Sequence, residues 1–419
     1  MGINDMQALQ EDKKILRSLV SSLRIIAEDP ANSTDKIEKW KKHTALKGDG
    51  PMVFVDPDGS WDELLPRDSL QCTHPAARKL EYDLRQRLIR HQYIQDDVPI
   101  TADVEVPKAI KNTWWGVKPK VVRLPGRGAY RMESIIDEPS DWKQLSMPII
   151  THDEKLSEEN FKFIQDAVGD LTNVTLVGHK DFRFHLLHWY CDYRGLDNML
   201  YDLYDEPEMV HDVMRFFTEG AKSMLRQYEE QNLISLNNDG QLHYTGGVGY
   251  NDQLPQPGFD PNRVRLCDVW GAAEAQEFAQ VSPEMHEEFV LQYERELLEP
   301  FGLNGYGCCD DLSAKLDNVL KIKNLRRVAV CPWADIAKFT PVLQKNYIMT
   351  WKPKPMPLAY DTFDPDIVRK ELEEGITKAN GGVLELILRD THTCKNEPER
   401  FGQWVKIARE SIEKCWEGK

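Results

Sequence analysis

Residues 346–390 read "NYIMTWKPKPMPLAYDTFDPDIVRKELEEGITKANGGVLELILRD". The stretch begins and ends with apolar runs of strand length, 346–352 and 381–390. Between the two runs, "DPDI" (364–367) places an Asp at an N-cap and a Pro at the first helical position, and a helical pattern follows to about residue 380. A strand, a helix and a second strand in this order are typical of a parallel sheet whose strands are buried on both faces.

The same alternation runs through most of the chain. The other segments that we expect to be strands are 98–106, 173–179, 233–239, 263–270, 302–308 and 326–331. Together with the two runs above they make eight strands separated by helices, which predicts a single (β/α)8 barrel over 96–419. An open doubly wound sheet is the alternative, but the chain lacks the GxGxxG phosphate fingerprint of that fold.

Residues 1–95 have a different pattern. Apolar residues recur at helical intervals in "MQALQEDKKILRSLVSSLRIIAED" (6–29) and again in "PAARKLEYDLRQRLIRHQYI" (75–94). Between them lies a turn-rich connection that contains "GDGP" and "DPDGS". We therefore expect an N-terminal helical extension over 1–95.

Composition limits the possible partners. The 419 residues are 41% hydrophobic and 29% charged, as in a soluble globular protein, and the formal net charge is −16. Such a charge argues against binding to a nucleic-acid backbone, which attracts concentrated Lys and Arg. We find no secretory leader and no apolar stretch near 18 residues, so we expect a cytoplasmic protein with no membrane partner.

Eight cysteines are scattered along the chain rather than packed into a small secreted framework. Scattered cysteines in a long chain are expected to be reduced, and reduced thiols are available as metal ligands. Two of them, Cys308 and Cys309, are adjacent in "GYGCCDDL" (305–312). Neighbouring strand residues face opposite sides, so one of the two thiols should point into the barrel or its mouth.

Polar residues gather near the ends of the expected strands, where the active site of a (β/α)8 barrel forms. A lone Cys in a strand is usually a small buried hydrophobe, and "DTHTC" (390–394) also suits a polar turn before the last helix, so these interpretations stay open beside a ligand role. The residues concerned are Asn237, Asn238, Asp239, Cys267, Asp268, Cys308, Cys309, Cys331, Asp390, His392 and Cys394.

Two further groups are candidates. The segment "GHKDFRFH" (178–185) carries His179 and Asp181, and it suits either an anionic substrate or a solvated turn. Trp270 and Trp333 lie near expected strand ends, where aromatic side chains line a substrate pocket or pack in the core.

Several of these segments together resemble the uroporphyrinogen decarboxylase superfamily over roughly residues 95–415. The resemblance is carried by "GLDNMLYDLYDEPEMVHDVM" (195–214), "CDVWGAAEAQEF" (267–278) with the following "VSPEMHEEFVLQYERELLEPFG" (281–302), and "GYGCCDD" (305–311). It implies a single (β/α)8 barrel. The superfamily includes the decarboxylase and zinc-dependent methyltransferases that serve corrinoid proteins. The Arg- and Gly-containing N-terminal segment of true decarboxylases is absent here, which favours the methyltransferase branch.

The resemblance also implies zinc ligands. In the methyltransferase branch a His-x-Cys motif on the fifth strand binds zinc, and here Tyr306, Gly307 and Cys308 stand in that place, so the Cys is kept and the His is not. Methyltransferases that act on methoxylated aromatics have a similar spacing to Asp239, Cys267 and Cys308, which have 27 and 40 intervening residues. We expect these three ligands. A methionine-synthase-like set is the alternative and would use Cys309 and Cys331 with His392 or Cys394.

From this resemblance we expect a methyltransferase that moves a methyl group from a small substrate, with a methoxylated aromatic favoured, to the cob(I)alamin of a separate corrinoid protein. Zinc would act as a Lewis acid on the heteroatom that carries the methyl group. His179, Asp181 and His392 would orient the substrate or protonate the leaving group. Asn238, Trp270, Tyr306 and Trp333 would line the substrate pocket. The rivals are a metal-free decarboxylase of a porphyrinogen-like polycarboxylate and a non-catalytic ligand-binding protein on the same scaffold.

Overall fold

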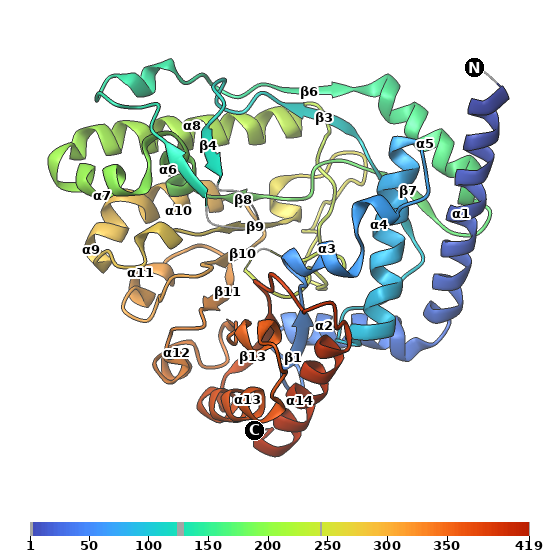
Figure 1. Ribbon diagram of the computed structural model, residues 1–419. Coiled ribbons are helices and arrows are strands. Elements are labelled where there is room, and N and C mark those ends of the chain that lie inside the picture. Colours follow the sequence, from blue (N-terminus) through green and yellow to red (C-terminus); the bar gives the residue numbers. More distant parts are fainter. Residues whose placement is uncertain (1–2, 124–129, 244, 419) are drawn as a thin grey trace.

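The computed structural model describes residues 3–123, 130–243 and 245–418 (Figure 1). It is a mixed α/β protein with a central sheet that is parallel throughout. Within the described residues this sheet has seven strands, in the order β1 (Met52–Val55), β13 (Val383–Leu388), β12 (Ile348–Trp351), β11 (Leu325–Val330), β10 (Leu303–Tyr306), β9 (Trp270–Ala273) and β8 (Arg183–Phe184).

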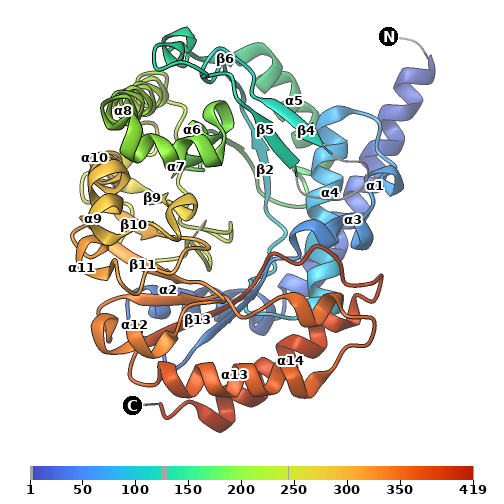
Figure 2. The same ribbon diagram turned by 60° about the vertical axis from the view of Figure 1, so that its left-hand side comes forward.

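A second parallel pair continues the sheet beyond β8. The chain runs from β7 (Val174–Val177) directly into β8, and β7 pairs with β2 (Val104–Pro107). At the junction the backbone N–H of Ala272 donates to the carbonyl of Phe182 at 2.9 Å. The strands thereby curve around a common centre with helices outside them, so the arrangement is barrel-like (Figure 2).

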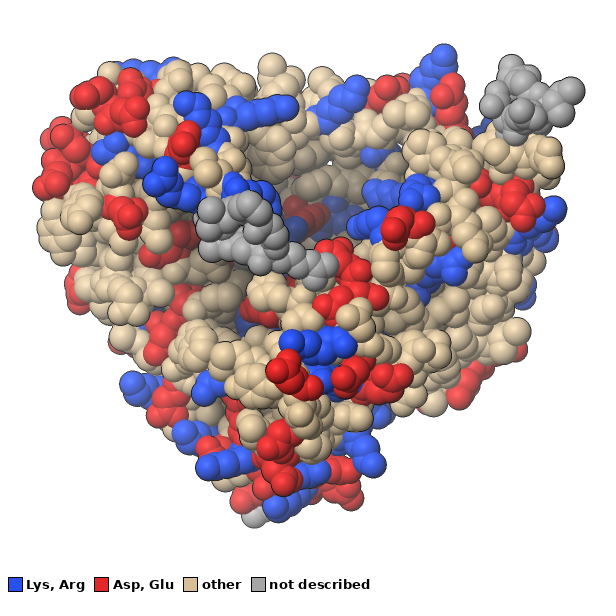
Figure 3. All heavy atoms as spheres, viewed as in Figure 1, with Lys and Arg blue, Asp and Glu red and all other residues tan. Residues whose placement is uncertain are grey.

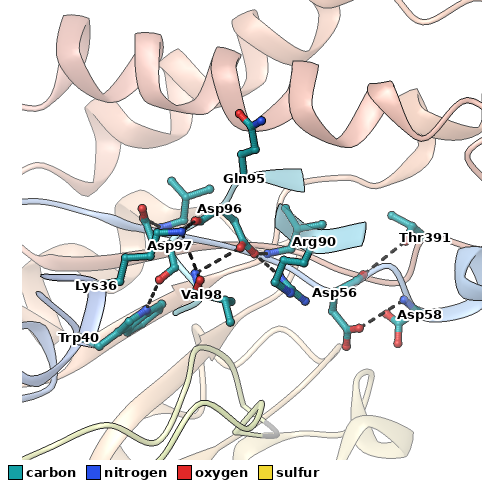
Figure 4. Close-up of polar contacts among 12 residues, drawn as sticks. Lys36, Trp40, Asp56, Asp58, Arg90, Gln95, Asp96, Asp97, Val98 and Thr391 are labelled. Atoms are coloured by element: carbon teal, nitrogen blue, oxygen red, sulfur yellow. Dashed lines mark hydrogen bonds and ion pairs between the residues drawn. The ribbon is translucent and has the colours of Figure 1, made fainter. Parts of the chain in front are cut away.

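Two carboxylates close the gap between β1 and β2. Within the described residues no strand ladder joins β1 to β2. Instead, the Asp96 carboxylate accepts from the backbone N–H of Val55 at 2.8 Å, and the Asp97 carboxylate accepts from that of Val53 at 2.7 Å. Arg90 pairs with the fully buried Asp96, as Figure 4 shows. We call Asp96 and Asp97 the seam.

Helices cover the outside of the ring, and α13 (Pro365–Ala379) shows why they form where they do. Asp364 caps it by accepting from the N–H of Asp366 at 2.9 Å, as the sequence predicted. Val368, Leu372 and Ile376 recur at helical spacing and are buried against the sheet. The other outer helices are α5 (Glu154–Val168), α6 (Leu186–Arg194), α7 (Leu196–Asp205), α8 (Pro207–Glu230), α9 (Pro283–His286), α10 (Gln292–Leu298), α11 (Leu316–Val319), α12 (Ile336–Leu343) and α14 (Glu399–Cys415).

The first hundred residues are helical, as expected, but not only helical. They form α1 (Ile3–Ala27), α2 (Thr34–Thr44), α3 (Trp61–Leu64) and α4 (Pro75–Ile89). Leu16 of α1, Leu84 of α4 and Ile164 of α5 belong to a hydrophobic core separate from that of the ring. The turn-rich connection also contains β1, a strand of the central sheet, which the sequence analysis missed. Among the described helices, none combines the length and the apolar character needed to cross a membrane.

Two antiparallel pairs lie apart from the central sheet. One joins β3 (Ala109–Asn112) to β6 (Ile150–Asp153), and the other is a hairpin of β4 (Lys120–Arg123) and β5 (Tyr130–Glu133). Both belong to the long connection between β2 and β7.

Residues 245–249 lie inside the ring, against residues of β11, β12 and β13. Arg327 and Glu385, both fully buried, form an ion pair at 3.0 Å, and Arg327 also donates to the carbonyl of Val248 at 2.8 Å. Gly247 has φ +65°, and a Cβ there would lie 2.8 Å from the Glu385 carboxylate oxygens, so only glycine fits. We call residues 245–249 the plug. We call the end of the ring at which the strands' carboxyl ends lie the open end.

Seven of the eight expected strands overlap strands of the structure, but 263–270 does so only at Trp270, and 233–239 overlaps none of the described strands. Residues 233–239 form only an isolated bridge at Ile234, because the Asn237 side chain bonds to the backbone of Trp270 in place of a ladder. Residues 263–269 contain a helical turn, Leu266–Asp268, whose Asp268 carboxylate accepts from the Arg265 N–H, and the strand begins only at Trp270.

We expect Asp96→Ala to lower the free energy of unfolding by about 3–5 kcal/mol, because it leaves Arg90 without its carboxylate and a buried N–H of β1 unpaired. Urea unfolding followed by circular dichroism measures this, with the exposed Asp68→Ala as the control. A loss below about 1 kcal/mol would mean that the seam does not hold β1 in place.

Candidate active site at the carboxyl ends of the strands

Charged and thiol side chains follow six strands at the open end of the ring. The carboxyl ends of barrel strands are where (β/α)8 enzymes place their catalytic groups. In Figure 3 the molecular surface is hollowed, with acidic and basic side chains inside the hollow. We define the carboxyl-end site by the residues that follow these strands: Asp56, Asp58, His185, Glu274, Cys308, Cys309, Lys352, Arg389 and Asp390.

Asp58 is the member of this site best suited to proton transfer. Its carboxylate accepts from the Asp390 N–H at 2.6 Å, and Arg389 lies 3.7 Å from the carboxylates of both Asp56 and Asp58. Figure 4 shows Asp56 and Asp58 side by side near Thr391. Burial, and then the neighbouring Asp56, raise the pKa of Asp58 to about 6, so this carboxyl can hold or release a proton near neutral pH.

The adjacent thiols of Cys308 and Cys309 are in hydrogen-bonding contact. Their sulfur atoms lie 3.5 Å apart, and the Cys309 sulfur lies 4.0 Å from a carboxylate oxygen of Asp390. Lys352 donates to the Cys308 carbonyl at 3.0 Å, and Gly307 before the pair has φ +91°. The hydrogen bond that the Cys309 thiol makes to Cys308, followed by burial, raises the pKa of the Cys309 thiol well above its ordinary value. Cys309 is therefore held in the thiol form, whereas the thiolate is the reactive form.

Two histidines at the start of α6 are each held by a glutamate. His185 Nδ1 lies 2.6 Å from a carboxylate oxygen of Glu274, and His188 Nδ1 lies 3.3 Å from Glu277. The hydrogen bond to Glu277 raises the pKa of His188 to about 9, so His188 is cationic at neutral pH. Glu274 is almost fully buried and fixes the orientation of the His185 ring.

A cavity of about 340 Å³ lies beside β8 and β9. The buried Lys180 ammonium lies 2.7 Å from Glu105 and is also bonded to Asp239, so its charge is neutralised. His243 is buried, and the described residues offer its Nδ1 no hydrogen-bond partner. We call this cavity the inner pocket; its lining includes Lys180, Asp181, Arg183, Asn237, His243 and Trp270.

The structure does not bring the three expected zinc ligands together. Cys267 precedes β9, and its carbonyl lies 2.2 Å from where a Cβ on Gly302 would be, just before β10. Cys308 follows β10, which runs parallel to β9 with Leu303 opposite Trp270. The two thiols therefore lie at opposite ends of neighbouring strands. Asp239 is already engaged by Lys180.

The alternative ligand set is not assembled either. Cys309 approaches Asp390, whereas the Cys394 sulfur donates to Glu63 at 3.3 Å and Cys331 is buried at the end of β11. In the part of the chain that the structure describes, no three His, Cys, Asp or Glu side chains are arranged to hold a metal ion. The residues present do not fit the expected zinc site.

The three expected catalytic residues lie in three different places. Asp181 lines the inner pocket, and His392 lies beside the turn at Asp58 and Gly59. His179 instead stacks on Tyr228 of α8, with ring centroids 4.3 Å apart, so it faces the helical layer. Burial there lowers the pKa of His179.

The expected substrate-binding residues are spread over the molecule. Trp270 lines the inner pocket, but Asn238 donates to the carbonyl of Leu254. Tyr306 faces the helices, where its hydroxyl donates to Glu294 at 2.7 Å, because alternate residues of a strand point to opposite sides. Trp333 is 69% exposed after β11.

Sequence reasoning missed Asp56, Asp58, Arg389 and Lys352. The signal for the first two was the apolar run "MVFV" (52–55) before "DPDG", which reads as a strand followed by a turn. Once β1 is recognised, both aspartates fall at a strand's carboxyl end. Arg389 and Lys352 directly follow strands that were predicted, so their position was available from the sequence.

The sequence matches no protein-family model and no curated protein sequence. Among solved structures, a methyltransferase from Methanosarcina mazei is similar in arrangement, at 10% sequence identity and a TM-score of 0.49. The likeness covers 90% of this chain and 98% of that chain. A likeness of this degree carries no argument about the reaction, which has to be inferred from the site itself.

The raised pKa of Asp58 predicts a pH dependence of stability. The folded protein keeps this proton up to about pH 6, whereas an unfolded Asp loses it near pH 3.8, so the free energy of unfolding falls as the pH rises between these values. Asp58→Asn removes the fall, by about 1–3 kcal/mol over the window. Urea unfolding at pH 4.5, 5.5 and 6.5 measures it, with Asp68→Asn as control. Parallel curves for the variant and the wild type would contradict the assignment.

Proposed function

We propose that the protein is a methyltransferase of the uroporphyrinogen decarboxylase type, built on a (β/α)8 barrel, that moves a methyl group from a small methylated substrate to a corrinoid on a separate protein. The proposal is supported by the sequence resemblance described above and by the ring of parallel strands with its open end. A methoxylated aromatic is the favoured donor. The corrinoid would supply the nucleophile that accepts the methyl group.

The observation that carries the proposal is the placement of Asp58 at the open end of the ring. When a methyl group leaves an oxygen or another heteroatom, that atom gains electron density and needs a proton. Asp58, with a pKa of about 6, is protonated often enough near neutral pH to supply it. Arg389, 3.7 Å away, holds the carboxylate that remains after the proton has gone.

The inner pocket supports a small, partly aromatic substrate. Trp270 provides an apolar wall, and its indole N–H donates to the carbonyl of Gly249 at 3.0 Å, which fixes the ring. A cavity of about 340 Å³ is at the small end of the size range of ligand pockets. Arg183 and Asp181 provide charged groups for a polar substituent.

The proposed reaction assigns no role to zinc, because the expected zinc ligands lie apart. If the protein binds zinc, the thiols at the open end are the groups available for it, since Cys308 and Cys309 lie beside Asp390. Cys267 lies at the other end of the sheet.

This placement predicts different effects for two cysteine variants. Cys267→Ala should keep the zinc content and the methyl-transfer rate within about twofold of the wild type, whereas Cys309→Ala should lower at least one of them about tenfold or more. Mass spectrometry of untagged, reduced protein and the rate of methyl transfer measure both. An equal loss of zinc content or methyl-transfer rate in the two variants would contradict this placement and would mean that Cys267 is a ligand.

The proposed reaction itself is tested with reduced cobalamin and a panel of donors that begins with methoxybenzoates. Formation of methylcobalamin is followed by absorbance. We expect turnover by the wild type and a decrease of about 100-fold in Asp58→Asn, since a general acid contributes about that much or more. Asp68→Asn is the matched surface control. No methyl transfer from methoxylated aromatics, methylamines, betaines or methyl halides would overturn the proposal.

A further inference from the structure

The adjacent thiols at the open end are close enough to be oxidised to one another. The sulfur atoms of Cys308 and Cys309 lie 3.5 Å apart. A disulfide bond is about 2.05 Å long, so the two sulfur atoms need to approach by about 1.5 Å, which rotation of the two side chains supplies. Both residues follow β10 after Gly307, at which the chain has φ +91°. The pair therefore lies in the bend after the strand, outside the ladder of the sheet.

The pair is accessible to a small oxidant rather than to a bulky one. Cys309 is partly exposed, whereas Cys308 is only 6% exposed. Hydrogen peroxide is little larger than water and suits such a position. A bulky disulfide such as oxidised glutathione has to bring one of its own sulfur atoms up to the attacking thiol, which the burial of Cys308 opposes.

The charges around the pair give the two thiols different roles. Lys352 donates to the Cys308 carbonyl at 3.0 Å, and Arg389 is near enough to Cys308 for their charges to interact. Neighbouring cations favour the thiolate, which is the nucleophile. The Cys309 thiol instead keeps its proton, because its hydrogen bond to Cys308 and its burial raise its pKa. Cys308 is therefore the attacking thiol, and Cys309 is the thiol that completes the disulfide.

We propose that Cys308 and Cys309 are a reversible oxidation site, at which hydrogen peroxide converts the two thiols to a disulfide and a dithiol reductant restores them. The Cys308 sulfur attacks one peroxide oxygen, so that an S–O bond forms, the O–O bond breaks and the departing oxygen leaves as water. The Cys309 sulfur then displaces the hydroxyl group from Cys308, so that the S–S bond forms and a second water leaves. Asp390, 4.0 Å from the Cys309 sulfur, is placed to take the proton of that thiol. Overall the two thiols lose two electrons and two protons, and the peroxide gains them.

The disulfide between these two residues is readily reduced again. Neighbouring Cα atoms are about 3.8 Å apart, which is less than the span of about 4.4–6.8 Å that an unstrained disulfide bridges. A strained disulfide has a higher reduction potential and belongs to the labile rather than the structural class. Its formation also draws the Cys309 sulfur away from Asp390 and so changes the open end of the ring. The inference rests on the geometry of the thiols and does not depend on the proposed methyl transfer.

The test treats reduced, full-length protein with hydrogen peroxide, blocks the remaining thiols with N-ethylmaleimide and maps the cysteines by mass spectrometry. The tryptic peptide 296–315 contains Cys308 and Cys309 and no other cysteine. Cys267 is also partly exposed but lies at the other end of the sheet, so it is the control thiol in the same sample. Cys309→Ser removes the second thiol, and Cys267→Ser is the matched control variant. Oxidised glutathione serves as the bulky oxidant.

In the wild type and in Cys267→Ser we expect the peptide 296–315 to lose two hydrogen atoms, and dithiothreitol to restore both thiols. In the wild type this loss should be about tenfold faster, or more, than the oxidation of Cys267. Cys309→Ser should stop at a sulfenic acid on Cys308, which dimedone traps.

The decisive mass change is measured in the wild type, so the result does not depend on how well a variant folds. Oxidation of Cys267 at an equal rate, or sulfinic acid in place of the disulfide, would overturn the proposed site. Absence of any change in the peptide 296–315 while Cys267 reacts would overturn it as well. Equally fast oxidation by oxidised glutathione would overturn the choice of a small oxidant.

Discussion

The architecture depends on the ion pair between Arg327 and Glu385 inside the ring. Both side chains are fully buried, and charges in such a place are tolerated only when they are paired and hydrogen-bonded. The additional bond from Arg327 to the Val248 carbonyl ties the pair to the plug. The plug thereby fills the inside of the ring, and the candidate site lies at the carboxyl ends of the strands around it.

The cysteines lie at different ends of the parallel strands. Cys308 and Cys309 lie at the open end, where their sulfur atoms are 3.5 Å apart beside Asp390, while Cys267 lies on the far side of the sheet. Cys267 and Cys308 both lie beside a strand in the sequence, but in the structure the length of a strand separates them. The groups that remain together at the open end are carboxylates and cations, and the pKa of one of these carboxyls, that of Asp58, is raised to about 6. The site is thus better suited to acid–base chemistry than to the metal chemistry that the sequence indicated.

Much of the fold could be predicted from the sequence, because the apolar runs and the helix N-cap of a segment such as 346–390 indicate its strands and helix directly. The failures have local causes. β1 is four residues long and lies among turns, so periodicity cannot reveal it, and with it Asp56 and Asp58 were lost. The segment 233–239 resembles a strand, but the Asn237 side chain replaces the ladder. Tyr306 and His179 were predicted near the correct strand ends, but their side chains point to the helical layer instead of the site. Neighbouring residues of a strand point to opposite sides, so an error of one residue reverses the direction of a side chain.

The claim that the carboxyl ends bind the substrate is tested most directly by hydrogen exchange with mass spectrometry, on protein saturated with a methoxybenzoate. The account predicts slower exchange in the segments that follow β1, β8, β10 and β13, at residues 56–60, 183–187, 307–311 and 389–393, and in the lining of the inner pocket at residues 180–182 and 241–243. Protection confined to residues 258–268, before β9, would place the ligand at the opposite end of the sheet and contradict the account.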